Sequence, residues 1–190
     1  MGSLGFAIFD TAIGRCGIVW SDRGVAGVQF PQASERATRA CIRRRHPQVR
    51  ETVPPVDVQR AIDDIAALLG GEPKDLGHVS IDTALVPDFN RRVYEIARAI
   101  PPGSTLSYGE IAERLGDRTL AREVGQALGE NPIPIIVPCH RVLAAGGKAG
   151  GFSAPGGVAT KLRLLSIEGA QAGEPTLFDR LPWATSRKSL

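Results

Sequence analysis

The stretch that decides the interpretation reads Asn131-Pro132-Ile133-Pro134-Ile135-Ile136-Val137-Pro138-Cys139-His140-Arg141. Its prolines fix φ and lack an amide hydrogen, so the segment cannot form an ordinary helix. The segment ends by placing Cys139 directly beside His140 and Arg141. A thiol with an ordinary pKa of about 8.5 becomes nucleophilic when imidazole or cationic neighbours favour the thiolate. The stretch therefore predicts a nucleophilic thiol in a fixed pose; the alternative is a small, buried, hydrophobic side chain.

Composition limits the class of protein. The chain has 190 residues, of which 43% are hydrophobic, so it can bury the core of one large or two small domains. A net charge of +3 and a pI of about 9.0 are compatible with nucleic-acid binding without demanding it. Three widely spaced cysteines do not form a disulfide framework and fit a reducing compartment. With neither a signal-peptide pattern nor a membrane-length apolar run, we expect a cytoplasmic protein.

The first part of the chain, residues 1–86, is predicted to be a structural α/β domain. Alternating apolar residues and glycine-containing turns predict antiparallel strands at 6–10, 16–20 and 25–30, and a further short strand at 79–81. Capping residues and apolar spacing predict helices at 34–45 and 57–69. The first helix carries five arginines, which form either a phosphate-facing patch or a solvated face.

The spacing of the cysteines and histidines does not favour a structural zinc site. The candidate ligands are two cysteines and two histidines, and they are Cys16, Cys41, His46 and His78. Their spacing lacks the close pairs of zinc ribbons and fingers. We therefore expect no metal.

The second part, residues 87–170, follows a linker at 83–87 and is predicted to be mostly helical. Apolar spacing predicts helices at 88–100, 107–115, 119–130 and 158–167, the last with an apolar face of Val158, Leu162 and Leu165. A glycine-rich loop at 144–157 precedes that last helix. The helices at 107–115 and 119–130 are close enough for a helix-turn-helix, although a plain helical bundle fits equally well. Residues 171–190 are expected to be a tail.

The motif Pro138-Cys139-His140-Arg141-Val142, preceded by Asn131-Pro132-Ile133-Pro134, resembles the active-site motif of the O6-alkylguanine-DNA alkyltransferases. These proteins are also called methylated-DNA–protein-cysteine S-methyltransferases. The resemblance covers residues 89–169 well and the first domain only loosely. It implies a small ribonuclease H-like antiparallel sheet with helices, followed by a helical domain whose helix-turn-helix binds the minor groove while the damaged nucleotide is flipped out.

The resemblance also implies roles for five residues of a catalytic group. Cys139 matches the alkyl acceptor, and His140 matches the histidine that activates the thiol through a water. Glu168 matches the carboxylate that orients the histidine, although a short insertion around 154–155 precedes it. Asn131 matches the organiser of the active-site turn, and Tyr108 matches the residue that rotates the 3′ phosphate and donates to the guanine.

Further matches surround the substrate and the DNA. The expected substrate-binding residues are Ser153, Phe152, Pro134 and Arg141. Phe152 stands where some relatives have tyrosine, so we expect an altered rate rather than lost activity, and Pro134 is associated with tolerance of larger alkyl groups. The expected DNA-binding residues are Arg122, Gly125, Thr119 and Tyr108, with Arg122 filling the gap that a flipped base leaves.

The function implied is DNA repair by direct damage reversal. An alkyl group on O6-alkylguanine, and also on O4-alkylthymine, would pass irreversibly to Cys139 in a single turnover, without a cofactor, in a monomer bound to double-stranded DNA. Two alternatives stay open. A cysteine hydrolase would use Cys139 and His140 repeatedly, and a non-enzymatic sensor of alkylated DNA would carry another residue in place of the cysteine.

Overall fold

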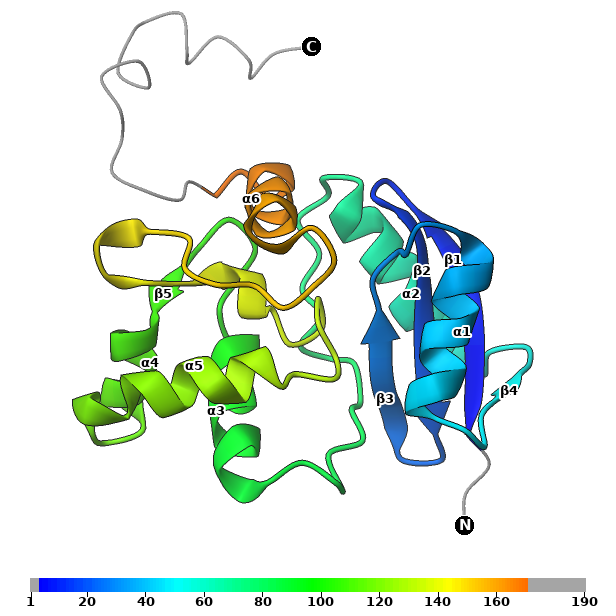
Figure 1. The fold of residues 1–190 in the computed structure, drawn as a ribbon, viewed down its shortest axis with the longest axis horizontal. Coiled ribbons are helices and arrows are strands. Elements are labelled where there is room, and N and C mark those ends of the chain that lie inside the picture. The colour runs from blue at the N-terminus through cyan, green and yellow to red at the C-terminus, as the bar shows by residue number, and fades with distance from the viewer. Residues whose placement is uncertain (1–3, 171–190) are drawn as a thin grey trace, which may run out of the picture.

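The computed structural model describes residues 4–170, and the expected tail lies outside this range (Figure 1). Within it, a small sheet at one side of the molecule faces a helical half at the other. This confirms a mixed α/β fold, while the ribonuclease H-like assignment stays a prediction. No helix in these residues is long and apolar enough to cross a membrane.

The sheet is built from two successive hairpins and one added strand. Strands β1 (Gly5–Thr11), β2 (Gly14–Ser21) and β3 (Gly24–Gln29) pair in antiparallel fashion, close to the predicted bounds. The sheet is not wholly antiparallel, because β4 (Arg50–Glu51) pairs with β1 in parallel and gives the order β3-β2-β1-β4. The predicted strand at 79–81 is wrong: only Ile81 bridges to Val25.

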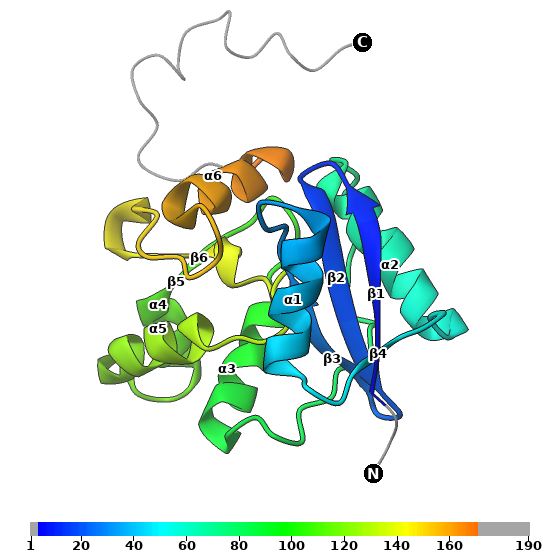
Figure 2. The ribbon, with the colours of Figure 1, turned by 45° about the vertical axis from the view of Figure 1, so that its right-hand side comes forward.

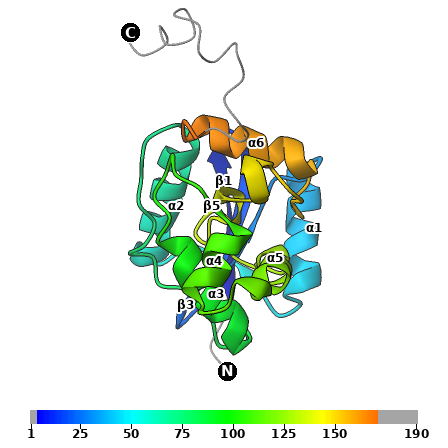
Figure 3. The same cartoon turned by 90° about the vertical axis from the view of Figure 1, so that its left-hand side faces the viewer.

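Helices α1 (Glu35–Arg45) and α2 (Val56–Leu69) lie against opposite faces of the sheet (Figures 2 and 3). The strand periodicity explains this arrangement, because successive side chains point to opposite faces. On β2, Val19 belongs to the cluster under α1, and Ile18 belongs to the cluster that includes α2. Gly17, two residues before Val19 and on the same face of the strand, admits α1 closely, since a Cβ there would collide with a methyl group of Ile42.

The helical half follows the predicted order with small changes. Its α-helices are α3 (Asp88–Arg98), α4 (Tyr108–Arg114), α5 (Ala121–Gly129) and α6 (Gly157–Ile167). Short 3-10 turns lie at Arg118–Leu120, Cys139–Arg141 and Ala145–Gly147, and strands β5 (Leu106–Ser107) and β6 (Val142–Leu143) pair in parallel. The capping box of Ser107 and Glu110 is confirmed. Helix α5 begins at Ala121 rather than near 119, because Asp117 caps a separate 3-10 turn.

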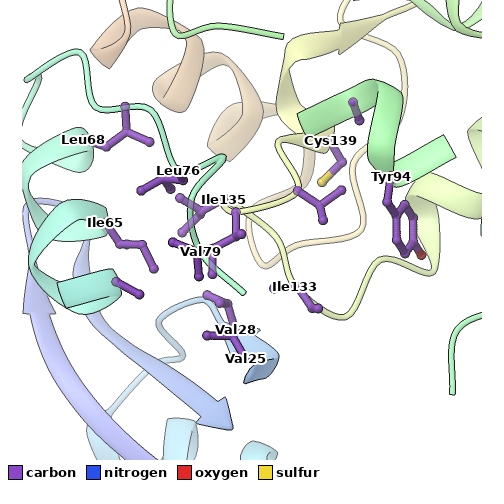
Figure 4. Close-up of a cluster of buried hydrophobic side chains, with 14 of the residues drawn as sticks. Val25, Val28, Ile65, Leu68, Leu76, Val79, Tyr94, Ile133, Ile135 and Cys139 are labelled. Carbon is purple, nitrogen blue, oxygen red and sulfur yellow. The ribbon is translucent and has the colours of Figure 1, made fainter. Parts of the chain in front are cut away.

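One core joins the two halves. Buried side chains of the sheet, such as Val25 and Val28, share a cluster with Ile133, Ile135 and Cys139 (Figure 4). The backbones are joined as well, since the amide of Val28 donates to the carbonyl of Pro132 at 3.0 Å. The predicted domain boundary at 83–87 stays a prediction. The loop that precedes Cys139 packs directly against the edge of strand β3.

Candidate active site

The side chain of Asn131 closes the loop that precedes the cysteine. Its Nδ2 donates to the carbonyl of Val137, and its Oδ1 accepts the amide of Ile133, both at 2.9 Å. The amide of Val137 also donates to the carbonyl of Ile133 at 2.9 Å. Within this closed loop Ile135 has a φ of 76° and is buried, a conformation that costs a β-branched residue about 1–3 kcal/mol. The surrounding hydrogen bonds and packing hold that strained turn in place.

The loop delivers Cys139 to the first position of the 3-10 turn, with 9% of the residue exposed. Burial raises the pKa of the Cys139 thiol, whereas a hydrogen bond from Asn131 and the charge of Lys161 oppose that rise. Burial also raises the pKa of Cys16, to about 11, and the opposing group there is only the hydroxyl of Thr11. Of these two thiols, Cys139 is the one placed beside groups that stabilise a thiolate.

Lys161 is the functional residue that sequence reasoning missed. It is fully buried on α6, its Nζ donates to the carbonyl of Val142 at 2.6 Å, and its ammonium lies 5.7 Å from the centroid of the Tyr108 ring. The predicted apolar face of α6 is therefore wrong in part. Val158 and Leu162 are 41% and 43% exposed, because the helix turns Lys161, Leu164 and Leu165 inward instead.

Behind the cysteine, three charged or polar side chains form a buried network. His140 Nε2 lies 2.9 Å from Glu168 Oε1, and Arg141 donates to both oxygens of Glu168 at 2.8 Å. Arg141 Nη1 also donates to the carbonyl of Ile100 at 2.6 Å. Despite the insertion at 154–155, Glu168 contacts both His140 and Arg141, and its role in orienting the histidine stays a prediction. Because the carboxylate has a bidentate arginine partner, its geometry is well fixed.

The network determines which groups are charged. Burial would raise the pKa of Glu168, but hydrogen bonds from His140 and Arg141 and their charges hold it at about 2. Burial lowers the pKa of His140, and Arg141 and Lys161 lower it further, against the opposing effect of Glu168. With Nε2 donating to the carboxylate, the neutral ring keeps Nδ1 as an acceptor. Nδ1 is buried and has no hydrogen-bond partner within residues 4–170.

Two cavities meet at Cys139. One, of about 460 Å³, is lined by Tyr108 and Gly125 as well as Cys139. The other, of about 330 Å³, extends toward the sheet and is lined by Pro134 and Asn131. Both cavities share the wall formed by Leu128, Gly129, Phe152 and Ser153. Cys139 therefore lines open space on two sides, so a small molecule in either cavity would lie beside it.

The expected substrate-binding residues differ in their placement. Ser153 lines both cavities, but its hydroxyl donates to the carbonyl of Gly129 at 3.1 Å. Phe152 packs edge-on against Phe30, with ring centroids 6.0 Å apart. Pro134 lines the 330 Å³ cavity. Arg141 is in the lining of neither cavity and instead holds Glu168 from behind.

The expected DNA-binding residues lie on α4, on α5 and on the 3-10 turn between them. Arg122 is exposed in the first turn of α5. Gly125 faces the Tyr108 ring, since a Cβ there would lie 3.8 Å from it. Thr119 is exposed on the preceding turn, where its hydroxyl donates to Asp117 at 2.6 Å. Burial raises the pKa of Tyr108, and the nearby Cys139 adds to the rise, so its hydroxyl remains a proton donor.

No group of three or more histidine, cysteine or acidic side chains that could hold a metal ion occurs in residues 4–170. The chemistry that the site itself offers is nucleophilic. Cys139 is followed in the chain by His140, whose buried neutral imidazole is fixed by a carboxylate that stays ionised. Such an arrangement has the nucleophile, base and orienting group of covalent catalysis.

Comparison with known proteins identifies the family of the chain. A family model described as "6-O-methylguanine DNA methyltransferase, DNA binding domain" matches residues 88–170. A methylated-DNA–protein-cysteine methyltransferase of Methanothermobacter thermautotrophicus is 34% identical over 153 residues, which is 80% of this chain and 78% of that protein. The protein of the same name from Mycobacterium tuberculosis strain H37Rv is 45% identical over 120 residues, 63% of this chain and 70% of that protein.

Solved structures give the same result. The crystal structure of Mycobacterium tuberculosis OGT in complex with DNA superposes with a TM-score of 0.69 at 34% identity, covering 89% of this chain and 95% of that one. O6-methylguanine-DNA methyltransferase from Pyrococcus kodakaraensis gives a TM-score of 0.66 at 27% identity, covering 88% and 99%. The chain belongs to the methylated-DNA–protein-cysteine methyltransferase family and is an enzyme of that class.

A first prediction concerns the buried network. The Glu168 carboxyl should titrate near pH 2 in the wild type, and Arg141→Met should raise that pKa because a stabilising cation is lost. Because the folded-state pKa is depressed, the stability it confers is present above the ordinary value of 4.5 and is lost as pH falls toward 2. Carbon-detected NMR of the glutamate carboxyls measures the titration.

Arg141→Met should also lower the free energy of unfolding at pH 7 by about 3–5 kcal/mol, since it breaks a buried ion pair. The matched control is Arg36→Met on exposed helix surface, which should leave both quantities unchanged. A wild-type Glu168 that titrates near 4.5 would contradict the network described above.

Proposed function

We propose that this protein repairs DNA by direct damage reversal, accepting the alkyl group of O6-alkylguanine on Cys139. The observation that carries the proposal is the position of Cys139, which lines two cavities and is followed in the chain by a buried His140 whose ring is held by Glu168. A cavity of several hundred Å³ is in the range of small-ligand sites and suits an extruded base. The alkyl carbon would then lie between the guanine O6 and the Cys139 sulfur.

Activation of the thiol follows from the charges of the network. Because burial raises the pKa of Cys139, the resting group is a protonated thiol. The bare Nδ1 of His140 takes the thiol proton through a bridging water, and Glu168 stabilises the imidazolium that forms. Lys161 supplies a buried positive charge that favours the thiolate. The Cys139 thiolate therefore forms mainly when His140 can accept the thiol proton.

The transfer itself is a single displacement. The sulfur attacks the alkyl carbon, a C–S bond forms, the C–O6 bond breaks, and its electron pair goes to the guanine oxygen. Charge that develops on the guanine is met by donors, which are the Tyr108 hydroxyl and the Ser153 backbone amide. The Ser153 hydroxyl is committed to Gly129, so the amide is the better donor. The Phe152 ring adds no hydroxyl to this set.

The product is a thioether, and nothing in residues 4–170 is placed to remove it. Each molecule therefore completes one turnover and needs no cofactor. O4-alkylthymine presents the same kind of alkyl–oxygen bond and is a second substrate. A cysteine hydrolase would turn over repeatedly and would need an oxyanion hole. Repeated turnover would therefore distinguish it from the transferase. A non-enzymatic sensor would lack the thiol, so the presence of Cys139 disfavours that alternative.

Recognition of duplex DNA is assigned to α4 and α5, which act as a helix-turn-helix placed in the minor groove by a monomer. Arg122 is exposed on α5 and fills the stack left by the flipped nucleotide. At Gly125 and Thr119 the protein backbone can approach the DNA closely. Flipping costs less for a base that pairs badly, which adds selectivity for damaged guanine. Two of the solved relatives support this proposal by their similarity, one of them crystallised with DNA.

A second prediction tests the transfer. Incubation with a duplex that carries O6-methylguanine should add one methyl group to the protein, and peptide mapping should place it on Cys139. Cys139→Ser should gain no mass, and Cys16→Ser should gain mass like the wild type, because Cys16 lies in the sheet away from both cavities. DNA binding by the wild type without any mass gain would refute the transferase proposal.

A third prediction concerns flipping. Arg122→Ala should keep the rate of transfer from free O6-benzylguanine and lose about tenfold or more of the rate on duplex DNA, since only the duplex requires a filled stack. Rates are measured by intact mass against time. The matched control, Arg60→Ala on the exposed face of α2, should lose little on either substrate. Equal losses on both substrates would show that Arg122 does not assist flipping.

A further inference from the structure

The C-terminal end of α5 is held by side chains from outside that helix. The last four carbonyl groups of any helix lack partners within it. Two of these carbonyls in α5 accept side-chain hydroxyls, that of Ala127 from Tyr94 at 2.9 Å and that of Gly129 from Ser153 at 3.1 Å. The end of α5 is therefore fixed both to α3 and to the glycine-rich loop.

The residue that ends α5, Glu130, is anchored to α3 as well. Its carboxylate accepts from Asn90 Nδ2 at 3.1 Å and from Gln126 Nε2 at 3.3 Å. The C-terminal end of a helix carries partial negative charge and disfavours an anion. Because Glu130 is the C-cap of α5, its two amide donors offset an unfavourable placement. Of the two donors, only Asn90 ties the carboxylate to another helix, since Gln126 belongs to α5 itself.

Asn90 and Tyr94 act together, because they are four residues apart and share one face of α3. Both are buried, with 8% and 1% of the residue exposed. Burial raises the pKa of Tyr94 to about 12, although a hydrogen bond with Asn90 opposes the rise. The nearby charges of Glu130 and Cys139 add to it, and Tyr94 shares a buried cluster with Cys139 (Figure 4). Together with their acceptors on α5, these two α3 residues form a contact that we call the α3 clamp.

We propose that the α3 clamp sets the position of α5 relative to the nucleophile, so that Asn90 is a positioning residue for transfer from duplex DNA. The inference deepens the proposed function and rests on it. Helix α5 carries Arg122 in its first turn, and the chain passes directly from Glu130 into Asn131, which closes the loop before the nucleophile. A duplex held at Arg122 therefore meets the sulfur correctly only when α5 is correctly placed.

The loop that carries the nucleophile has supports of its own. Asn131 closes it internally, and the amide of Val28 on β3 donates to the carbonyl of Pro132 at 3.0 Å. Loss of the α3 clamp should therefore move α5 more than it moves the sulfur. A free base can adjust its position inside the cavity, whereas a flipped nucleotide stays attached to the DNA that α5 holds. The clamp should thus matter for duplex DNA and matter little for a free base.

The test exchanges donor and acceptor across the clamp. Asn90→Asp places two carboxylates against each other, whereas Asn90→Asp combined with Glu130→Gln restores a hydrogen bond in the opposite direction. Glu130→Gln alone keeps an oxygen acceptor for Asn90 and is the matched control. Intact mass against time gives the rates of transfer from duplex O6-methylguanine and from free O6-benzylguanine.

Asn90→Asp should lower the duplex rate about tenfold and leave the free-base rate within about twofold, since a displacement of only about 1 Å can cost about a hundredfold. Glu130→Gln should behave like the wild type, and the double variant should recover most of the duplex rate. Glu130→Ala, at an exposed residue, should show the same selective loss as Asn90→Asp. This variant tests the clamp without placing an acid in the core.

Three results would overturn the clamp. A wild-type duplex rate in Asn90→Asp or in Glu130→Ala would show that α5 does not depend on this contact, and equal falls on both substrates would indicate a structural role only. A double variant as slow as Asn90→Asp would show that the buried acid, not the broken pair, causes the loss. Methyl transfer by the wild type separates these failures from failure of the proposed function. If the wild type gains no methyl group, the transferase proposal itself is wrong, and the clamp is withdrawn with it.

Discussion

The paired hydrogen bonds of Asn131 are the constraint on which the active site depends. One side chain ties the amide of Ile133 to the carbonyl of Val137 and closes a loop that includes a strained residue, Ile135. Prolines alone would stiffen this segment without determining where it ends. The closed loop places Cys139 where two cavities meet, and the same Asn131 side chain lowers the pKa of the thiol against the rise that burial causes.

Two supports hold that loop from outside. On one side the edge of β3 bonds to Pro132, so the sheet of the first half buttresses the loop even though it carries none of the catalytic residues. On the other side Glu168 binds His140 and Arg141 together, at the end of a helix whose Lys161 is buried beside the thiol. Burying so many charges is costly unless they are paired, and each of them has a fixed partner.

Local patterns predicted most elements, because strands and amphipathic helices leave periodic signals. They failed where long-range contacts dominate. Strand β4 is two exposed residues without periodicity, and α6 turns Lys161 inward against the apolar spacing of Val158 and Leu162. Cys139 and His140 were evident from chemistry, whereas the family resemblance supplied the roles of Glu168 and Arg122. No pattern in the local sequence linked Arg45 to the site, because Arg45 lies on α1, in the first half of the chain, and lines the 330 Å³ cavity from there.

The most direct test of the account compares two reactions of Cys139 in Asn131→Ala. Iodoacetamide reports how much thiolate is present, whereas alkyl transfer from duplex O6-methylguanine also requires the pose of the sulfur. Because a displacement of about 1 Å can cost about a hundredfold in rate, transfer should fall by roughly that factor, and the iodoacetamide reaction should fall far less. Equal falls in both reactions, or transfer at the wild-type rate, would contradict the claim that Asn131 fixes the nucleophile.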